Sequence, residues 1–128
     1  MAGPACRIWT FNAGDLVVYQ YSASRSGETP LQVLGGSTGT LVVDGYTGYN
    51  QVTTPTGRTR SGCLAHLRRK LFDAKRQAPD MQVGLELILD VYKIEHEALA
   101  TGIARTPAHG ELRNTRSRVA MAALKTWL

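Results

Sequence analysis

The sequence predicts a mixed fold of the α/β or α+β class, with strands in its first half and helices in its second half. Two observations support this prediction, and the length adds an expectation about the number of domains. Short runs of β-branched and aromatic residues, which are typical of strands, occur before residue 63. From Leu64 to the last residue, apolar side chains recur with helical spacing. The length of 128 residues suits one domain with a modest core rather than two.

The first two strands are expected at Arg7–Phe11 and Leu16–Tyr21, because both runs are rich in β-branched or aromatic residues. The segment Asn12-Ala-Gly14-Asp15 separates them and is typical of a hairpin turn. A short helix is expected over Glu28–Gly35, with a proline in its first turn and a pair of glycines at its end.

Another strand, Thr40–Val43, leads to Asp44. Gly45–Gln51 is expected to form a short helix or turn. Val52–Gly57 is a predicted loop, because it combines threonines with a proline and a glycine. Arg58–Cys63 is expected to form a further short strand.

Helices are expected from Leu64 onward, with breaks near Pro79 and around Thr106–Gly110. The first predicted helix, Leu64–Gln77, has an apolar stripe that should be buried. The stripe consists of Leu64, Leu67, Leu71 and Ala74.

Asp44 is the first candidate site residue, because a short β-branched run ends at it and a glycine follows it. A strand end holds a carboxylate rigidly, and Mg²⁺ prefers oxygen ligands of this kind. An Asp-Gly pair after a strand is also typical of an ordinary turn, in which the aspartate accepts hydrogen bonds from nearby backbone N–H groups. The segment alone leaves both interpretations open.

The segment Thr59–Phe72 reads Thr-Arg-Ser-Gly-Cys-Leu-Ala-His-Leu-Arg-Arg-Lys-Leu-Phe. It resembles the Cys-Trp-Ala-His-x-Arg-Arg-x-Phe signature of the insertion-sequence-66 family of bacterial transposases. Four other blocks in the matching order are similar to that family, and the resemblance runs from about Arg7 to the last residue. They are Tyr21–Pro30, Gly39–Tyr49, Val91–Glu97 and Leu124–Leu128.

The resemblance implies a ribonuclease-H-like catalytic domain that cuts and joins DNA with three acidic residues, the DDE arrangement, around Mg²⁺. Asp44 matches the second acid, at the end of the fourth core strand. The first acid of the family belongs to a strand upstream of the segment matched by Arg7, and the third to an Asn-rich segment downstream. We therefore expect a fragment of a DDE transposase, with one of three catalytic acids, that is inactive alone.

The same resemblance divides the chain into a partial ribonuclease-H-like core, residues 1–63, and a helical region similar to the family's insertion, residues 64–128. It implies that Cys63 and His66 are structural residues joining the last core strand to the helices. A Cys-x-x-His pair supplies only half of a zinc site, so a zinc protein is the weaker interpretation. Leu64 stands where the family usually has tryptophan.

Seven basic residues against one acid lie between residues 58 and 76, beside the predicted metal ligand. Such a block suits a DNA-facing edge, because phosphate neutralisation supplies most sequence-independent affinity. A solvated helix face is the alternative. The predicted DNA-binding residues are Arg58, Arg60, Arg68, Arg69, Lys70, Lys75 and Arg76.

Glu95 lies among apolar residues on the predicted helix Gln82–Ala100. A carboxylate in such a place needs a partner, or its pKa rises. Two interpretations follow: Glu95 pairs with an arginine between helices, which we favour, or it is the third catalytic acid.

The resemblance implies a bacterial protein with DNA as partner and possible contacts with other transposase subunits. Two cysteines, Cys6 and Cys63, give no disulfide framework, which indicates a cytoplasmic location. The sequence has no apolar run of the length that spans a bilayer, and its first five residues lack the pattern of a signal peptide. The alternative to a transposase fragment is a stand-alone, non-catalytic nucleic-acid-binding module that kept the basic helix.

Overall fold

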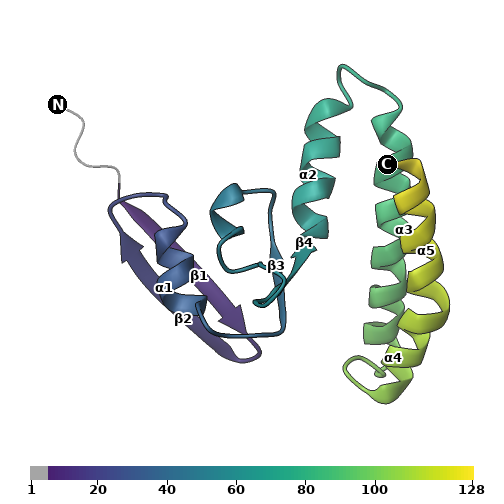
Figure 1. Ribbon diagram of the computed structural model, residues 1–128. Coiled ribbons are helices and arrows are strands. Elements are labelled where there is room, and N and C mark those ends of the chain that lie inside the picture. Colours follow the sequence, from purple (N-terminus) through teal and green to yellow (C-terminus); the bar gives the residue numbers. More distant parts are fainter. Residues whose placement is uncertain (1–5) are drawn as a thin grey trace. The chain divides into compact units, whose positions relative to one another are not determined.

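The computed structural model describes residues 6–128, so the segment in which a signal peptide was sought lies outside the described residues. The chain divides into two compact units, Met1–Cys63 and Leu64–Leu128, which are described separately (Figure 1). The first contains both small sheets, and the second is helical. This mixture agrees with the predicted α+β class.

The first sheet is the predicted hairpin, and both of its strands extend slightly further than expected. Strand β1 covers Arg7–Ala13 and strand β2 covers Leu16–Ser22, paired antiparallel. A two-residue turn joins them, and Gly14 adopts a positive φ of 59° there. Glycine reaches this left-handed conformation without the steric cost that a Cβ imposes.

The second sheet consists of strand β3, Thr40–Val43, and strand β4, Thr59–Gly62. They are parallel, with Val43 opposite Gly62. Helix α1, Glu28–Leu34, precedes β3, and the 3-10 helix η1, Thr47–Tyr49, follows it. These elements confirm the predicted ones with small shifts at their ends.

The helical unit begins with α2, Leu64–Ala74, and α3, Met81–Ala100. Helix α4 covers Pro107–Leu112, a π-helix, η2, covers Arg113–Ser117, and α5 covers Arg118–Trp127. Figure 1 shows α5 lying alongside α3.

Three features of the helical elements differ from the prediction. Helix α2 ends three residues early, ahead of Pro79, whose missing N–H and ring disfavour a continuing helix. The second break lies over residues 101–106, because Pro107 begins helix α4 in the first-turn position that suits proline. The π-helix was not predicted.

The core of the helical unit is formed by Leu71 of α2, Ile88 of α3 and Leu124 of α5. Leu64 and Leu67 are half-buried, but Ala74 is exposed, contrary to the predicted stripe, because α2 ends at that residue. Gly84 allows close packing here: a Cβ at this position would lie 2.4 Å from ring atoms of Trp127.

Apolar side chains of the first unit are less completely buried. Trp9, Val43 and Val52 are buried. Most residues of strand β2 are exposed, including large apolar ones at Leu16, Val17, Val18, Tyr19 and Tyr21.

Candidate functional site

Asp44 directly follows strand β3 and is half-buried. Its Oδ1 accepts a hydrogen bond of 2.9 Å from the Tyr46 backbone N–H. This is the bond that the turn interpretation predicts, and it also orients the carboxylate. Oδ2 accepts no hydrogen bond from any residue that the structure describes, so it is available to another ligand.

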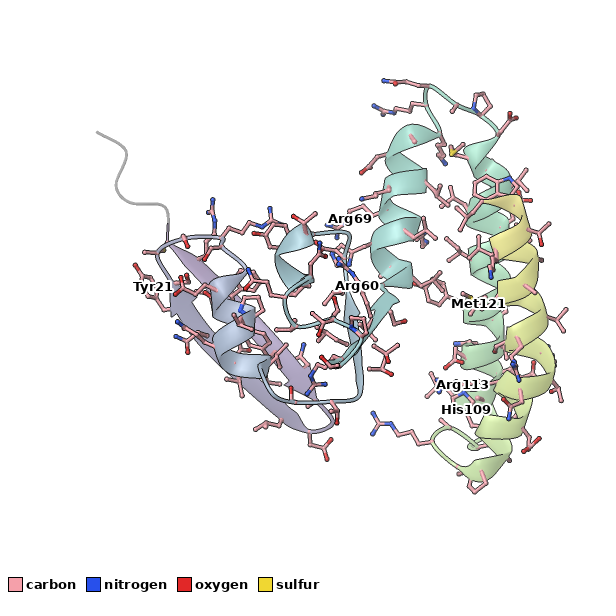
Figure 2. The ribbon with its side chains drawn as sticks, viewed as in Figure 1. Tyr21, Arg60, Arg69, His109, Arg113 and Met121 are labelled. Carbon is pink, nitrogen blue, oxygen red and sulfur yellow. The ribbon has the colours of Figure 1, made fainter. Side chains whose placement is uncertain are left out.

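Residues 44–50, here called the Asp44 turn, are held by Arg60 of strand β4, which Figure 2 labels. The Arg60 guanidinium donates hydrogen bonds to the carbonyl oxygens of Asp44, at 2.9 Å, and Tyr46, at 2.8 Å. It also donates to Asn50 Oδ1 at 2.7 Å. A planar guanidinium with several donors suits this task, because one side chain ties three acceptors together.

Arg58 is also engaged inside its unit, where its Nε donates a 2.8 Å hydrogen bond to Ser37 Oγ. Both Arg58 and Arg60 were predicted to bind DNA from their charge. The structure gives them internal hydrogen bonds, and their contact with DNA stays a prediction.

Aromatic rings surround the Asp44 turn. The Tyr46 and Tyr49 rings meet edge to face, with centres 5.8 Å apart, and Trp9 packs against both. Burial raises the pKa of the Tyr49 hydroxyl above its usual value, and the negative charge of Asp44 raises this pKa further. The carboxylate therefore acts electrostatically on this aromatic cluster.

The basic block of α2 is exposed at Arg68, Arg69 and Lys70, and these side chains make no hydrogen bond or ion pair with the described residues (Figure 2 labels Arg69). Lys75 is half-buried, with its Nζ 4.6 Å from the centre of the Phe72 ring. Arg76 is exposed in the turn after α2 rather than on the helix itself. These side chains offer positive charge to solvent, as a phosphate-binding surface requires.

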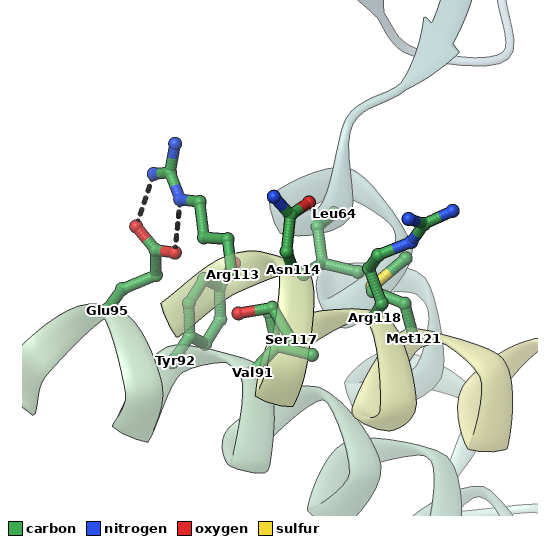
Figure 3. A pocket seen from close by; sticks show the side chains of 9 residues that line it. All are labelled: Leu64, Val91, Tyr92, Glu95, Arg113, Asn114, Ser117, Arg118 and Met121. Atoms are coloured by element: carbon green, nitrogen blue, oxygen red, sulfur yellow. Dashed lines mark hydrogen bonds and ion pairs between the residues drawn. The ribbon is translucent and has the colours of Figure 1, made fainter. Parts of the chain in front are cut away.

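Glu95 pairs with an arginine, as the favoured interpretation expected. Arg113 Nε donates to Glu95 Oε1 at 2.8 Å, and its Nη2 donates to Oε2 at 2.5 Å (Figure 3). These hydrogen bonds lower the pKa of the Glu95 carboxyl below its usual value, and its partial burial opposes them. Both carboxylate oxygens are thus engaged within the helical unit.

His109 adds a second contact to this pair, and Figure 2 shows it next to Arg113. The buried ring accepts a hydrogen bond from the Arg105 backbone N–H at Nδ1, 3.2 Å away. Its Nε2 lies 3.3 Å from Glu95 Oε2, without the alignment of a hydrogen bond. His109 was not predicted from the sequence, because it lies fourteen positions from Glu95 and in the segment expected to break the helices.

A pocket of about 400 Å³ lies beside the Glu95–Arg113 pair. Val91 and Tyr92 of α3 line it, together with Leu64 and Met121 (Figure 3). The buried Ser117 Oγ also lies at this pocket, without a hydrogen-bond partner among the described residues.

Cys63 and His66 are placed at the junction of strand and helix. The Cys63 backbone N–H donates a 2.8 Å hydrogen bond to Val43 O, which extends the β3–β4 pairing by one residue. The His66 side chain is exposed on α2. Within residues 6–128, no group of three or more His, Cys, Asp or Glu side chains is arranged to hold a metal ion. Among the same residues, no helix combines the length and apolar character needed to cross a bilayer.

Comparison with known proteins identifies relatives. The family model described as "Transposase IS66 family" matches residues 2–128. The uncharacterized protein y4jD of Sinorhizobium fredii (strain NBRC 101917 / NGR234) is 34% identical over 99 residues, which cover 71% of this chain and 19% of y4jD. The uncharacterized protein y4qI of the same strain is 28% identical over 121 residues, which cover 85% of this chain and 21% of y4qI.

The chain therefore spans about a fifth of the length of the curated relatives that it matches. No solved structure matches it significantly. Because the family match extends over nearly every residue, this chain belongs to the IS66 family of transposases.

Proposed function

We propose that this chain supplies one catalytic carboxylate, Asp44, to a DDE transposase centre that cleaves and transfers DNA strands. The observation that carries the proposal is the position of Asp44, directly after a strand of a parallel pair, in a turn held by Arg60. A rigid strand end and an oriented turn preorganise a carboxylate for chemistry.

The proposed ribonuclease-H-like core is supported by the two small sheets. An antiparallel hairpin and a parallel pair form separate sheets among the described residues. We propose that a further strand, which carries the first acid, joins them into one sheet. We propose that such a strand belongs to the longer transposase, and that residues 64–128 are the helical insertion.

Asp44 fits one ligand position of a magnesium site, with Oδ2 as the available oxygen. Bound Mg²⁺ ions would stabilise the attacking and leaving oxygens of the phosphodiester displacement. Two such ions need several converging oxygen ligands, and one carboxylate does not provide them. We therefore propose that the 128-residue chain alone is inactive, and that Glu95, held by Arg113, is structural rather than catalytic.

A second candidate function is a non-catalytic nucleic-acid-binding module. The exposed basic side chains of α2 favour it, because they need no further acids to bind phosphate. DNA is a partner in both proposals, and other transposase subunits are partners in the first alone. The coding sequence on either side of this chain discriminates between the two: an upstream strand with an aspartate and a downstream Glu-Arg segment favour the transposase.

Strand cleavage tests the catalytic proposal directly. The purified chain, incubated with supercoiled plasmid and Mg²⁺ or Mn²⁺, is expected to produce no nicks. In a longer family member, replacing the aspartate that matches Asp44 by asparagine should abolish strand transfer, because the metal ligand is lost, while DNA binding persists. Replacing the glutamate that matches Glu95 by glutamine should leave measurable strand transfer. Metal-dependent nicking by the 128-residue chain that disappears in Asp44→Ala would contradict the proposed inactivity.

A further inference from the structure

Arg25 lies beside the Asp44 turn although it belongs to the loop between β2 and α1. The two loops approach so closely that a Cβ added at Gly27 would lie 2.4 Å from the Gly48 carbonyl oxygen. The Tyr46 hydroxyl donates a hydrogen bond to the Arg25 carbonyl oxygen. The Arg25 guanidinium in turn lies over the Tyr46 ring, 4.6 Å from its centre. Arg25 is thus placed by contacts of both its backbone and its side chain.

Tyr46, whose ring lies under this guanidinium, is itself held in place by several contacts. Its backbone N–H is bonded to Asp44 Oδ1, and its carbonyl oxygen accepts a hydrogen bond from Arg60. Its ring packs against the ring of Tyr49. Because Tyr46 is fixed at several atoms, the side chain above it loses less conformational entropy on binding a ligand than a freely moving arginine would.

The Arg25 guanidinium is exposed, and none of its N–H groups bonds to a residue that the structure describes. This differs from Arg58 and Arg60, which hold loops through internal hydrogen bonds. A guanidinium stacked on an aromatic ring still directs its N–H groups outward, where they match the oxygens of a phosphate.

The electrostatic effects on the pKa of Tyr49 are consistent with this placement of Arg25. The Asp44 carboxylate raises the pKa of Tyr49, and the Arg25 guanidinium lowers it, although burial has the largest effect. Both charges therefore lie close enough to the same tyrosine to act on it. A cation near the acid suits a place where a polyanionic strand passes the carboxylate.

We propose that Arg25 binds a backbone phosphate of the DNA strand that passes Asp44. This inference rests on the proposed function, since it assumes that DNA reaches the Asp44 turn. It adds a strand-positioning contact that the charge pattern of the sequence did not single out. The ligand class is a phosphodiester, bound through the guanidinium N–H groups.

The test uses the 128-residue chain and a duplex oligonucleotide that is fluorescently labelled. Anisotropy titrations at several salt concentrations give the slope of log affinity against log salt. Arg25→Ala is expected to reduce the magnitude of this slope by about 1, because one phosphate contact is lost. Arg25→Lys should restore most of the slope, since the charge returns. Arg116→Ala is the matched control: it removes the same charge from a side chain already paired with Glu97.

A spectrum of the ¹⁵N-labelled chain locates the contact. Addition of the oligonucleotide should shift the backbone amide signals of Tyr46 and Gly48 in the wild type and not in Arg25→Ala. A wild-type slope and wild-type shifts in folded Arg25→Ala would overturn the inference and leave the proposed DNA contact intact. Absence of any DNA binding by the wild-type chain, by contrast, would overturn the inference together with the DNA-binding part of the proposed function.

Discussion

The two units of this chain differ in how completely they bury their apolar side chains. The helical unit has a contiguous core in which Ile88 is fully buried and Leu124 is 1% exposed. The first unit, by contrast, buries fewer apolar side chains, namely Trp9, Val43 and Val52. Large exposed apolar side chains occur in both units, for example Tyr19 at 70% and Val119 at 68%. Burial of apolar surface is the main stabilising contribution to folding. The helical unit therefore has a core that can stabilise it by itself, whereas the first unit has fewer buried apolar side chains to stabilise its sheets.

The residues proposed to act in function lie outside the best packed part of the molecule. The residues of the Asp44 turn belong to the unit with the smaller core, where Arg60 and aromatic packing hold the turn. The basic α2 residues lie on the outside of the better packed unit.

Each unit also carries one of the two tryptophans, Trp9 in the first and Trp127 in the second. Trp9→Phe and Trp127→Phe backgrounds therefore let fluorescence follow each unit separately.

The largest expected effect is that of Ile88→Ala on the helical unit. Removing this buried side chain should cost about 2–5 kcal/mol of unfolding free energy, through lost apolar burial and the cavity left behind. Urea unfolding, followed through Trp127 in the Trp9→Phe background, should show a lower midpoint. Val119→Ala, at a side chain 68% exposed, is the control and should change the midpoint little. If the Trp9 signal, followed in the Trp127→Phe background, shifts by the same amount in Ile88→Ala, the two units unfold as one, and the helical unit has no separate stability.

A smaller effect is expected for Glu95→Gln, which removes the charge that binds Arg113. The loss should be on the order of 1 kcal/mol, because the hydrogen bonds are charge-assisted but the pair is partly screened by solvent. Glu97→Gln is the matched control: Glu97 pairs with Arg116 in a more exposed position, so its replacement should cost less.

The Glu95 effect should also depend on pH. The Arg113 hydrogen bonds lower the pKa of this carboxyl in the folded state below its ordinary 4.5. Its contribution to stability is therefore complete above about the ordinary value and is lost as pH falls through the lowered one. Thermal unfolding of wild type and Glu95→Gln between neutral and acid pH should show their difference shrinking in that acid range. A constant difference would show that the charge of Glu95 is not its stabilising property.

The smallest effect is expected for the exposed basic side chains of α2 and of the turn that follows it, here called the α2 surface. Replacing Arg69 and Arg76 by alanine should reduce the magnitude of the salt slope of DNA binding by about 2 without unfolding the helix. Anisotropy titrations measure this slope. The double control Lys93→Ala with Arg116→Ala removes equal charge from side chains already paired with Asp90 and Glu97. Equal changes in both double variants would mean that net charge alone, and not the α2 surface, governs binding.

Local sequence signals predicted most elements of the fold. The β-branched run Thr40–Val43 and the helix beginning at Glu28 are confirmed, because strand propensity and a first-turn proline act over a few residues. The arginine partner of Glu95 was also expected, since a carboxylate on an apolar helix face requires one. The identity of Arg113 was not, because eighteen positions separate it from Glu95 and only the packing of two helices brings them together.

The roles of the arginines were harder to predict from the sequence, because the charge of a guanidinium does not reveal its hydrogen-bond partners. Arg60 was grouped with the α2 residues, but its donors hold the Asp44 turn. Arg25 lies inside the family-like block Tyr21–Pro30 and was not predicted to bind DNA, because its place on Tyr46 depends on two loops that meet in the folded unit. The role of Asp44 as a metal ligand stays a prediction, because residues 6–128 contain no group of three or more His, Cys, Asp or Glu side chains arranged to hold a metal ion.

The π-helix has a consequence for helical phase. Arg113 and Leu124 are eleven positions apart, which in an uninterrupted α-helix is about three full turns and would place them on the same face. The wider turn at Arg113–Ser117 changes the rotation between them. The Arg113 side chain is 56% exposed and bound to Glu95, whereas Leu124 is 1% exposed in the core. The π-helical turn thus allows one continuous segment to place the Arg113 guanidinium at the exposed edge of α3 and the Leu124 side chain in the core of the helical unit.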